Sequence, residues 1–128
     1  MKEAVKEWIQ KAEEDFAAAL KLIGAKGRFY NVVCFHCQQS VEKYIKAIMQ
    51  FNEKHIKKTH SLAFLADQVK ECLPRIELFS EDLKWLDVFA VQIRYPGEKA
   101  GKNDAVKAVN ISKSIRGIVR PYLGLKQK

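Results

Sequence analysis

Apolar residues recur at every third or fourth position through most of the chain, a spacing that places them on one face of an α-helix. The first periodic segment runs from about Lys2 to Ile23, and Gly24 and Gly27 supply its end. The second runs from about Tyr30 to Phe51 and carries a broad apolar surface. Because no segment alternates in the manner of a β-strand, both are predicted to be long amphipathic helices.

Two shorter predicted helices follow a polar connection. Thr59 is the predicted N-cap of the third helix, which ends near Pro74. Ser80 is the predicted N-cap of the fourth helix, whose core side continues to Ile93. Both caps are hydroxyl residues that can accept a hydrogen bond from a free backbone N–H group of the first turn.

The loop Arg94–Lys102 contains a proline and two glycines and breaks the helical pattern. A fifth helix is predicted from Asn103 or Asp104 to about Arg120, where Pro121 ends or kinks it. Five helices with short connections predict an all-α fold, an antiparallel up-and-down helical bundle of four to five helices.

Composition narrows the class of protein. With 128 residues, of which 48% are hydrophobic and 30% charged, the chain is expected to form a single helical domain over residues 1–128. Its apolar runs are too short to span a bilayer, and its N-terminal segment lacks the apolar stretch of a signal peptide. We therefore expect a cytoplasmic protein with no membrane partner.

The cysteines are Cys34, Cys37 and Cys72, an odd set without a secretion signal, which favours reduced thiols. Cys34 and Cys37 have CxxC spacing, but both fall on the apolar side of the second helix and no second ligand pair follows. Core cysteines are therefore favoured over a zinc or redox site. Because the chain also lacks a P-loop, a GxGxxG and an HExxH motif, we predict no metal and no cofactor.

The net charge of +8 is concentrated in the C-terminal part of the chain. Residues 94–128 carry 9 basic and 2 acidic side chains, whereas residues 1–93 carry 14 and 13. This asymmetry favours an anionic partner such as a nucleotide, a nucleic acid or an acidic protein face. The fifth helix groups its cations on one face, which is either a solubilising face or a surface for phosphates or an acidic partner. These cations are Lys102, Lys113, Arg116 and Arg120.

A polar stripe follows the second predicted helix within about a quarter of its circumference. The stripe consists of His36, Gln39, Lys43, Lys46 and Gln50, with Glu42 at its edge. One interpretation is an ordinary solvated face. The other is a phosphate-binding surface, since two lysines one turn apart with amide and imidazole donors beside them suit a phosphate group.

The segment Arg94-Tyr95-Pro96-Gly97 places a guanidinium and a phenol at the end of the fourth helix, before a residue that fixes φ. It is either a tight turn whose arginine packs locally or a rigid mount that presents Arg94 to an anion. The pattern alone leaves both interpretations open.

Four short motifs, in this order, resemble those of the HEPN family of prokaryotic helical domains. They are Ala12 and Asp15 in the first helix, residues 38–47 in the second, the Thr59-His60-Ser61-Leu62 segment, and Arg94-Tyr95-Pro96. The resemblance spans nearly the whole chain. It implies a helical bundle that commonly forms homodimers and is often encoded beside a small MNT-type nucleotidyltransferase, in pairs linked to toxin–antitoxin behaviour.

The resemblance also implies two kinds of activity. Several HEPN branches are metal-independent ribonucleases that use an arginine and a later histidine with four to six residues between them, and others bind nucleotides or only their partner. Arg94 matches the arginine, but Lys99, Ala100 and Gly101 stand where the histidine would fall. Cleavage needs a general acid or base beside the RNA 2′-hydroxyl, and lysine is a poor one near neutral pH. His60 can take that role only if the fold delivers it to Arg94.

The leading hypothesis is a HEPN-like domain that binds the phosphate of a nucleotide or RNA and acts with a nucleotidyltransferase partner. The predicted ligand-binding residues are Gln39, Lys43, Lys46, Arg94 and Tyr95. One alternative is a HEPN ribonuclease with an altered catalytic base, using Arg94 and His60. Another is a purely protein-binding helical module. The missing histidine favours binding over cleavage.

Overall fold

The chain folds into five α-helices and one 3₁₀ helix, and the computed structural model describes residues 1–127. In chain order the elements are α1 (Glu3–Ile23), α2 (Tyr30–Phe51), α3 (Leu62–Val69), η1 (Pro74–Phe79), α4 (Ser80–Gln92) and α5 (Lys102–Tyr122). These residues contain no β-strand. The predicted all-α fold is confirmed, and the two long N-terminal helices lie where the hydrophobic periodicity placed them.

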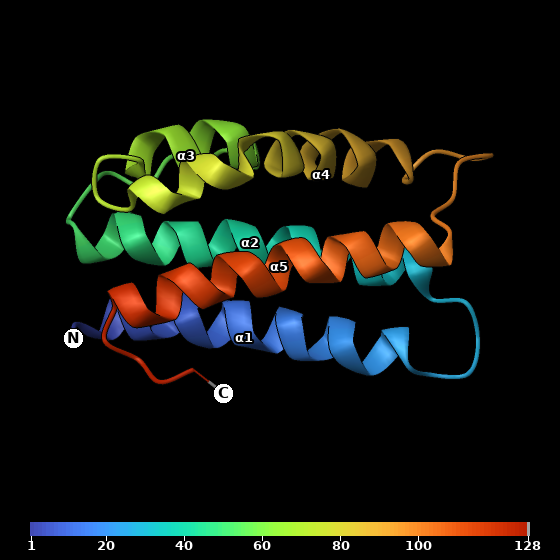
Figure 1. Ribbon diagram of the computed structural model, residues 1–128, viewed down its shortest axis with the longest axis horizontal. Coiled ribbons are helices and arrows are strands. Elements are labelled where there is room, and N and C mark those ends of the chain that lie inside the picture. The colour runs from blue at the N-terminus through green and yellow to red at the C-terminus, as the bar shows by residue number, and fades with distance from the viewer. Residues whose placement is uncertain (128) are drawn as a thin grey trace.

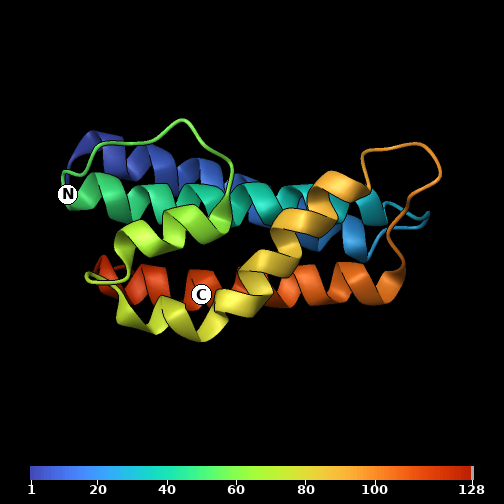
Figure 2. The same cartoon turned by 90° about the horizontal axis from the view of Figure 1, so that it is seen from above.

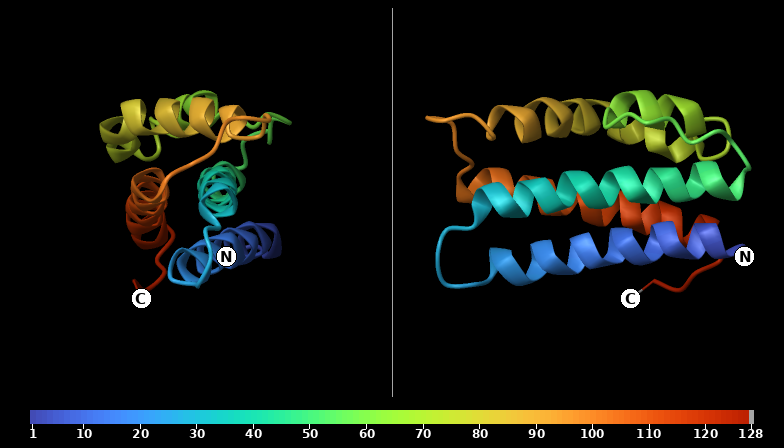
Figure 3. Two further views of the ribbon diagram at one scale, coloured as in Figure 1. Left: turned by 90° about the vertical axis from the view of Figure 1, so that its right-hand side faces the viewer. Right: turned by 180° about the vertical axis from the view of Figure 1, so that it is seen from behind.

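The elements form a helical bundle in which the shorter helices all lie on one side. The helices α1, α2 and α5 run the length of the molecule, and α3, η1 and α4 cover α2 and α5 from one side (Figure 1). The end-on view shows this covering layer across α2 and α5, with α1 packed on the opposite side of α2 (Figure 3). The chain reverses direction between α1 and α2 and again between α4 and α5, which makes the bundle up-and-down (Figure 1).

The centre of the core is α2, which contacts α1, α3, α4 and α5. Its fully buried apolar side chains include Val41, Tyr44, Ile45 and Ile48, all on the face predicted to be apolar. A side chain of this size contributes about 1.5–3 kcal/mol when it is completely removed from water. This central column therefore holds the surrounding helices together.

The starts of the short helices differ from the prediction. Ser61, not Thr59, is the N-cap of α3, because its Oγ accepts a hydrogen bond of 3.2 Å from the Phe64 N–H. Ser80 does not cap α4, since η1 runs directly into α4 and the N-cap position is held by Phe79, which makes no side-chain cap hydrogen bond. The periodicity did not reveal η1 because so short a 3₁₀ segment has no long apolar repeat.

The fifth helix begins at Lys102, slightly earlier than predicted, and continues to Tyr122. Asp104 closes its first turn by accepting the Gly101 N–H at 2.9 Å. Pro121 lies within the last turn, so the helix extends just past it. None of the helices within residues 1–127 is long and apolar enough to cross a membrane.

The connection between α2 and α3 determines where a site can form. It leaves the end of α2, runs back along the bundle and reaches the middle of α2 before α3 begins (Figure 2). This path returns His60 to the side of α2 that carries Gln38 and Glu42. A polar residue of the loop is thereby placed over the polar edge of the central helix.

Candidate functional site

A hollow of about 320 Å³ opens between α2, the start of α3 and the end of α4. It is lined by Gln38, His60, Ser61, Asp87, Ala90, Val91 and Arg94. His60 and Arg94, which are distant in the sequence, therefore face the same space. Both residues that the ribonuclease hypothesis names therefore line one hollow.

His60 is anchored at two points on α2. The amide Nε2 of Gln38 donates to the His60 backbone carbonyl at 3.1 Å, and the imidazole Nδ1 lies 3.0 Å from Glu42 Oε1. The Glu42 side chain is only 5% exposed, whereas the His60 side chain is 81% exposed. No group within residues 1–127 bonds to the second ring nitrogen. One imidazole nitrogen is thus fixed to the protein and the other is available to a ligand.

Glu42 also binds Lys46, one helical turn further along α2. The ammonium lies 2.9 Å from Glu42 Oε2 and 5.6 Å from the ring centroid of Trp8, and the Lys46 side chain is 8% exposed. A buried ammonium that is already neutralised has little to offer a phosphate in solvent. The geometry therefore does not support Lys46 as a ligand-binding residue.

Two other residues of the helix-two stripe, His36 and Lys43, pair with α1. Lys43 Nζ lies 2.5 Å from Asp15 Oδ2, and His36 Nδ1 lies 2.8 Å from Asp15 Oδ1. Asp15 thus pairs across the interface between α1 and α2. Gln39 donates to Gln38 Oε1 at 2.8 Å, so it contacts a residue that lines the hollow. The stripe is neither a solvated face nor a row of free cations.

Arg94 follows the end of α4 and keeps its charge available. Its guanidinium lies 5.6 Å from the ring centroid of Phe35, and it forms no ion pair within the part of the chain that the structure describes. Tyr95 beside it is exposed, and its phenol has no hydrogen-bond partner there. Gly97 adopts φ +88°, which turns the loop away from α4. The Arg94 guanidinium therefore packs on an aromatic ring and is accessible to an anion.

The carboxylate in the hollow, Asp87, serves the backbone of α3. Its two oxygens accept the N–H groups of Leu62 and Ala63 at 2.8 and 3.1 Å. Burial raises the pKa of Asp87 above its ordinary value, although these two hydrogen bonds oppose the rise. Asp87 thus holds the start of α3, and with it the segment that carries His60. Sequence reasoning missed Asp87, Gln38 and Phe35 because their partners lie on other elements.

The HEPN domain model matches residues 5–122. This chain belongs to the HEPN family. The crystal structure of TT1696 from Thermus thermophilus is similar, with a TM-score of 0.79, 23% identity, and coverage of 92% of this chain and 97% of that one. The structure of ST0689, an archaeal HEPN homologue, has a TM-score of 0.70 and 27% identity, and covers 94% and 98%. No curated protein is significantly similar to the chain.

In this HEPN domain the basic face of α5 is partly turned inward. Arg116 Nε lies 2.7 Å from Glu13 Oε2, and Arg120 Nη1 lies 3.2 Å from Glu13 Oε1. Tyr44 also donates a hydrogen bond to Glu13. Burial alone would raise the pKa of Glu13, but the hydrogen bonds from Arg116 and Tyr44 and the two arginine charges outweigh it, so the Glu13 pKa lies below its ordinary value. These arginines join helices and do not form an open phosphate face.

The two helix-two cysteines of the HEPN domain are core residues, as predicted. Cys34 and Cys37 are free thiols and fully buried. Burial raises the pKa of Cys34 to about 12 and shifts that of Cys37 upward as well. Both therefore remain protonated at neutral pH and have little nucleophilic character. Within residues 1–127 no cluster of metal-ligating side chains forms.

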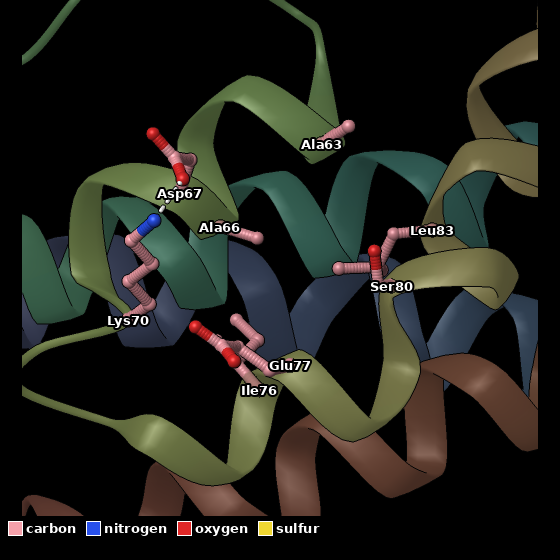
Figure 4. Close-up of a pocket in the computed structure, with 8 residues that line it drawn as sticks. All are labelled: Ala63, Ala66, Asp67, Lys70, Ile76, Glu77, Ser80 and Leu83. Atoms are coloured by element: carbon pink, nitrogen blue, oxygen red, sulfur yellow. Dashed lines mark ion pairs between the residues drawn. The ribbon is translucent and has the colours of Figure 1, made fainter.

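A further hollow of about 230 Å³ lies between α3, η1 and the start of α4, where Figure 4 shows its lining. Its lysine, Lys70, directly follows α3 and lies 2.8 Å from Asp67 of that helix. Glu77 adds a second carboxylate to the wall. Because its cation is paired and its other charged groups are acidic, this hollow does not suit an anion.

Proposed function

We propose that this HEPN domain binds the phosphate of a nucleotide or of RNA in the hollow that Arg94 and His60 line together. The observation that carries the proposal is the shared hollow, in which an unpaired guanidinium and an anchored imidazole face the same space. A guanidinium presents several N–H donors in a plane and can contact two phosphate oxygens at once. With both ring nitrogens protonated, the imidazolium donates a further hydrogen bond from Nε2–H to a phosphate oxygen.

The surroundings keep these two groups in place. Gln38 and Glu42 hold the loop and the ring of His60, and the Phe35 ring supports the Arg94 guanidinium. Less side-chain freedom is then lost when a ligand binds. Tyr95 is exposed beside Arg94, where its phenol can donate to a ligand oxygen. From the sequence-predicted set, Arg94 and Tyr95 remain in the proposed site, and Gln39 supports it indirectly.

Calorimetry with AMP and with a short RNA tests this function. Replacing Arg94 with Ala removes a charge-assisted contact worth about 1.5–3 kcal/mol, so we expect roughly 10- to 100-fold weaker binding. Arg75→Ala is the matched control, because Arg75 is an exposed arginine on η1 that lies outside the hollow. Equal affinity of the Arg94→Ala protein, with unchanged helicity, contradicts the proposal.

A ribonuclease is the second candidate, and the contact between His60 and Glu42 favours it. A carboxylate that fixes one imidazole nitrogen orients the other for proton transfer. In such a reaction His60 takes the proton of the RNA 2′-hydroxyl while the 2′-oxygen forms a bond to the neighbouring phosphorus. Arg94 offsets the charge on the phosphate oxygens, and the departing 5′-oxygen takes a proton from water. The products are a 2′,3′-cyclic phosphate and a 5′-hydroxyl.

Incubation of RNA with purified protein separates the two candidates. Cleavage that yields cyclic phosphate ends and disappears in both His60→Gln and Arg94→Ala supports the enzyme. Binding without cleavage by the wild-type protein supports the phosphate-binding function alone. If RNA is neither bound nor cleaved, the chain acts as a protein-binding module.

We further propose a homodimer and an MNT-type nucleotidyltransferase partner, in a pair of the toxin–antitoxin kind. The exposed side of α4 and the turn after it supports a protein contact, because Val88, Val91 and Tyr95 are exposed apolar or aromatic side chains beside the Arg94 hollow. Sedimentation of the wild type against Val88→Glu/Val91→Glu tests the dimer. Co-expression with the product of a neighbouring nucleotidyltransferase reading frame tests the partner.

A further inference from the structure

A third, larger hollow lies at the end of the bundle where the α1–α2 and α4–α5 loops meet. Its volume is about 650 Å³, compared with about 320 Å³ for the hollow at Arg94. Its lining includes three cations, Arg28, Lys99 and Lys102, and the aromatic ring of Phe29. No carboxylate of residues 1–127 lines it. The proposed function at Arg94 makes no use of this space.

The three cations are not neutralised by the protein. Within residues 1–127 none of them forms an ion pair or a side-chain hydrogen bond. The neighbouring carboxylates have other partners, since Asp104 accepts the Gly101 N–H at 2.9 Å and Glu98 lies 3.5 Å from the Gln92 amide. By contrast, the arginines on the inner side of α5 are paired with Glu13. The charged side chains that line the hollow are therefore all cationic, and neither Glu98 nor Asp104 is part of the lining.

A hydrogen bond between distant segments gives the hollow its form. Asn31 at the start of α2 accepts the backbone N–H of Ala100 at 2.7 Å. This contact ties the loop that carries Lys99, and that leads into α5 at Lys102, to the helix that follows Arg28. The cations of the two loops are thereby kept around one space and do not diverge into solvent.

One face of α2 connects the two hollows. Asn31, Phe35 and Gln38 are spaced by four and three residues, so they lie on the same side of the helix. Asn31 lines the basic hollow and Gln38 lines the Arg94 hollow, about 10 Å apart along the helix axis at 1.5 Å per residue. Phe35 lies between them, exposed and in contact with Arg94. An aromatic ring between two cationic sites matches the alternation of bases and phosphates in a single strand.

We propose that the basic hollow is a second phosphate site and that the ligand is a single-stranded RNA segment that extends from Arg94 along α2 to Lys99 and Lys102. The inference rests on the proposed function for the position of the strand at Arg94. The second site itself rests on Arg28, Lys99 and Lys102. A mononucleotide occupies only the Arg94 hollow, whereas an oligonucleotide contacts both.

The test compares AMP with a single-stranded RNA octamer, using calorimetry and fluorescence anisotropy. The variant Lys99→Gln/Lys102→Gln is expected to weaken octamer binding about 10-fold and to leave AMP binding unchanged. Because each phosphate contact to a single strand contributes about 0.7 to the salt slope, the slope should fall by about 1.4. Lys6→Gln/Lys11→Gln is the control, since it removes two exposed lysines from the outer side of α1.

The outcomes separate the two proposals. If Lys99→Gln/Lys102→Gln weakens the octamer while Arg94→Ala has no effect on either ligand, the function at Arg94 is wrong and the basic site stands. If the Lys99→Gln/Lys102→Gln protein binds the octamer like the control, the second site is wrong. It is also overturned if the wild type binds no octamer or binds duplex RNA equally well.

Discussion

Glu42 and His60 are joined by a contact of 3.0 Å between a carboxylate side chain that is 5% exposed and an imidazole side chain that is 81% exposed. The same carboxylate lies 2.9 Å from the buried ammonium of Lys46. A line of contacts therefore leads from the α1–α2 interface to the rim of the candidate site. The loop that carries His60 is held by groups whose own positions are determined by the core.

Replacement of Lys46 should lower the unfolding free energy far more than its position in a polar stripe of the sequence indicates. Lys46→Ala leaves the Glu42 carboxylate buried with only His60 beside it, so we expect a loss of about 3–5 kcal/mol in unfolding free energy. Lys113→Ala, at an exposed position of α5, should change it by less than about 0.5 kcal/mol. Urea unfolding measures both. A Lys46→Ala protein as stable as the control shows that the buried pair does not form.

Phe35 should position Arg94 without contacting the phosphate itself. Loss of a cation–π contact worth about 0.5–1 kcal/mol predicts that Phe35→Leu weakens AMP binding about two- to fivefold. Phe35→Tyr keeps a ring under the guanidinium and should restore the affinity. Phe51 is exposed at the last position of α2, and Phe51→Leu is the control for the loss of an aromatic ring. Equal affinities of the Leu and Tyr variants exclude this role.

Asp87 should govern both the start of α3 and the site beside it. Replacing Asp87 with Ala leaves the Leu62 and Ala63 N–H groups without their acceptor, and we expect a loss of about 1–2 kcal/mol in stability. Amide hydrogen exchange should accelerate at residues 61–65. The comparison is Asp67→Ala, an exposed carboxylate on α3 that pairs only with Lys70. Unchanged protection of these amides from exchange in the Asp87→Ala protein contradicts the role of Asp87 as a cap on the start of α3.

The contacts of Glu13 with α5 predict an acid-sensitive contribution to stability. Because the Glu13 pKa is lower in the folded chain than in the unfolded one, its carboxylate stabilises the fold above the ordinary glutamate pKa of about 4.3. That stabilisation is lost as the pH falls through the lowered value. The stability difference between wild type and Glu13→Gln should be constant near neutrality and shrink in acid. Glu14→Gln, an exposed neighbour without an ion pair in the described residues, should show no such trend.

Local pattern determined the helices of this protein. The periodicity of α1 and α2 predicted their ends closely, because an amphipathic helix must turn its apolar face to a core wherever that core lies. The buried cysteines of α2 followed from the same reasoning. The motif order was sufficient for the HEPN family, which the match over residues 5–122 confirms. The segment between Val69 and Ser80 was less predictable, since η1 leaves no long repeat in the sequence.

Tertiary structure decided which polar residues remain available. Helix spacing grouped Lys43 and Lys46 as one surface, but their partners, Asp15 and Glu42, neutralise both charges. Spacing also grouped Arg116 with the other cations of α5, although it forms an ion pair with Glu13 of α1. Conversely, the return path of residues 52–61 brings His60 to the hollow of Arg94. Local spacing defines the side of a helix on which a charge lies, whereas the packing of other elements decides whether that charge is neutralised or free.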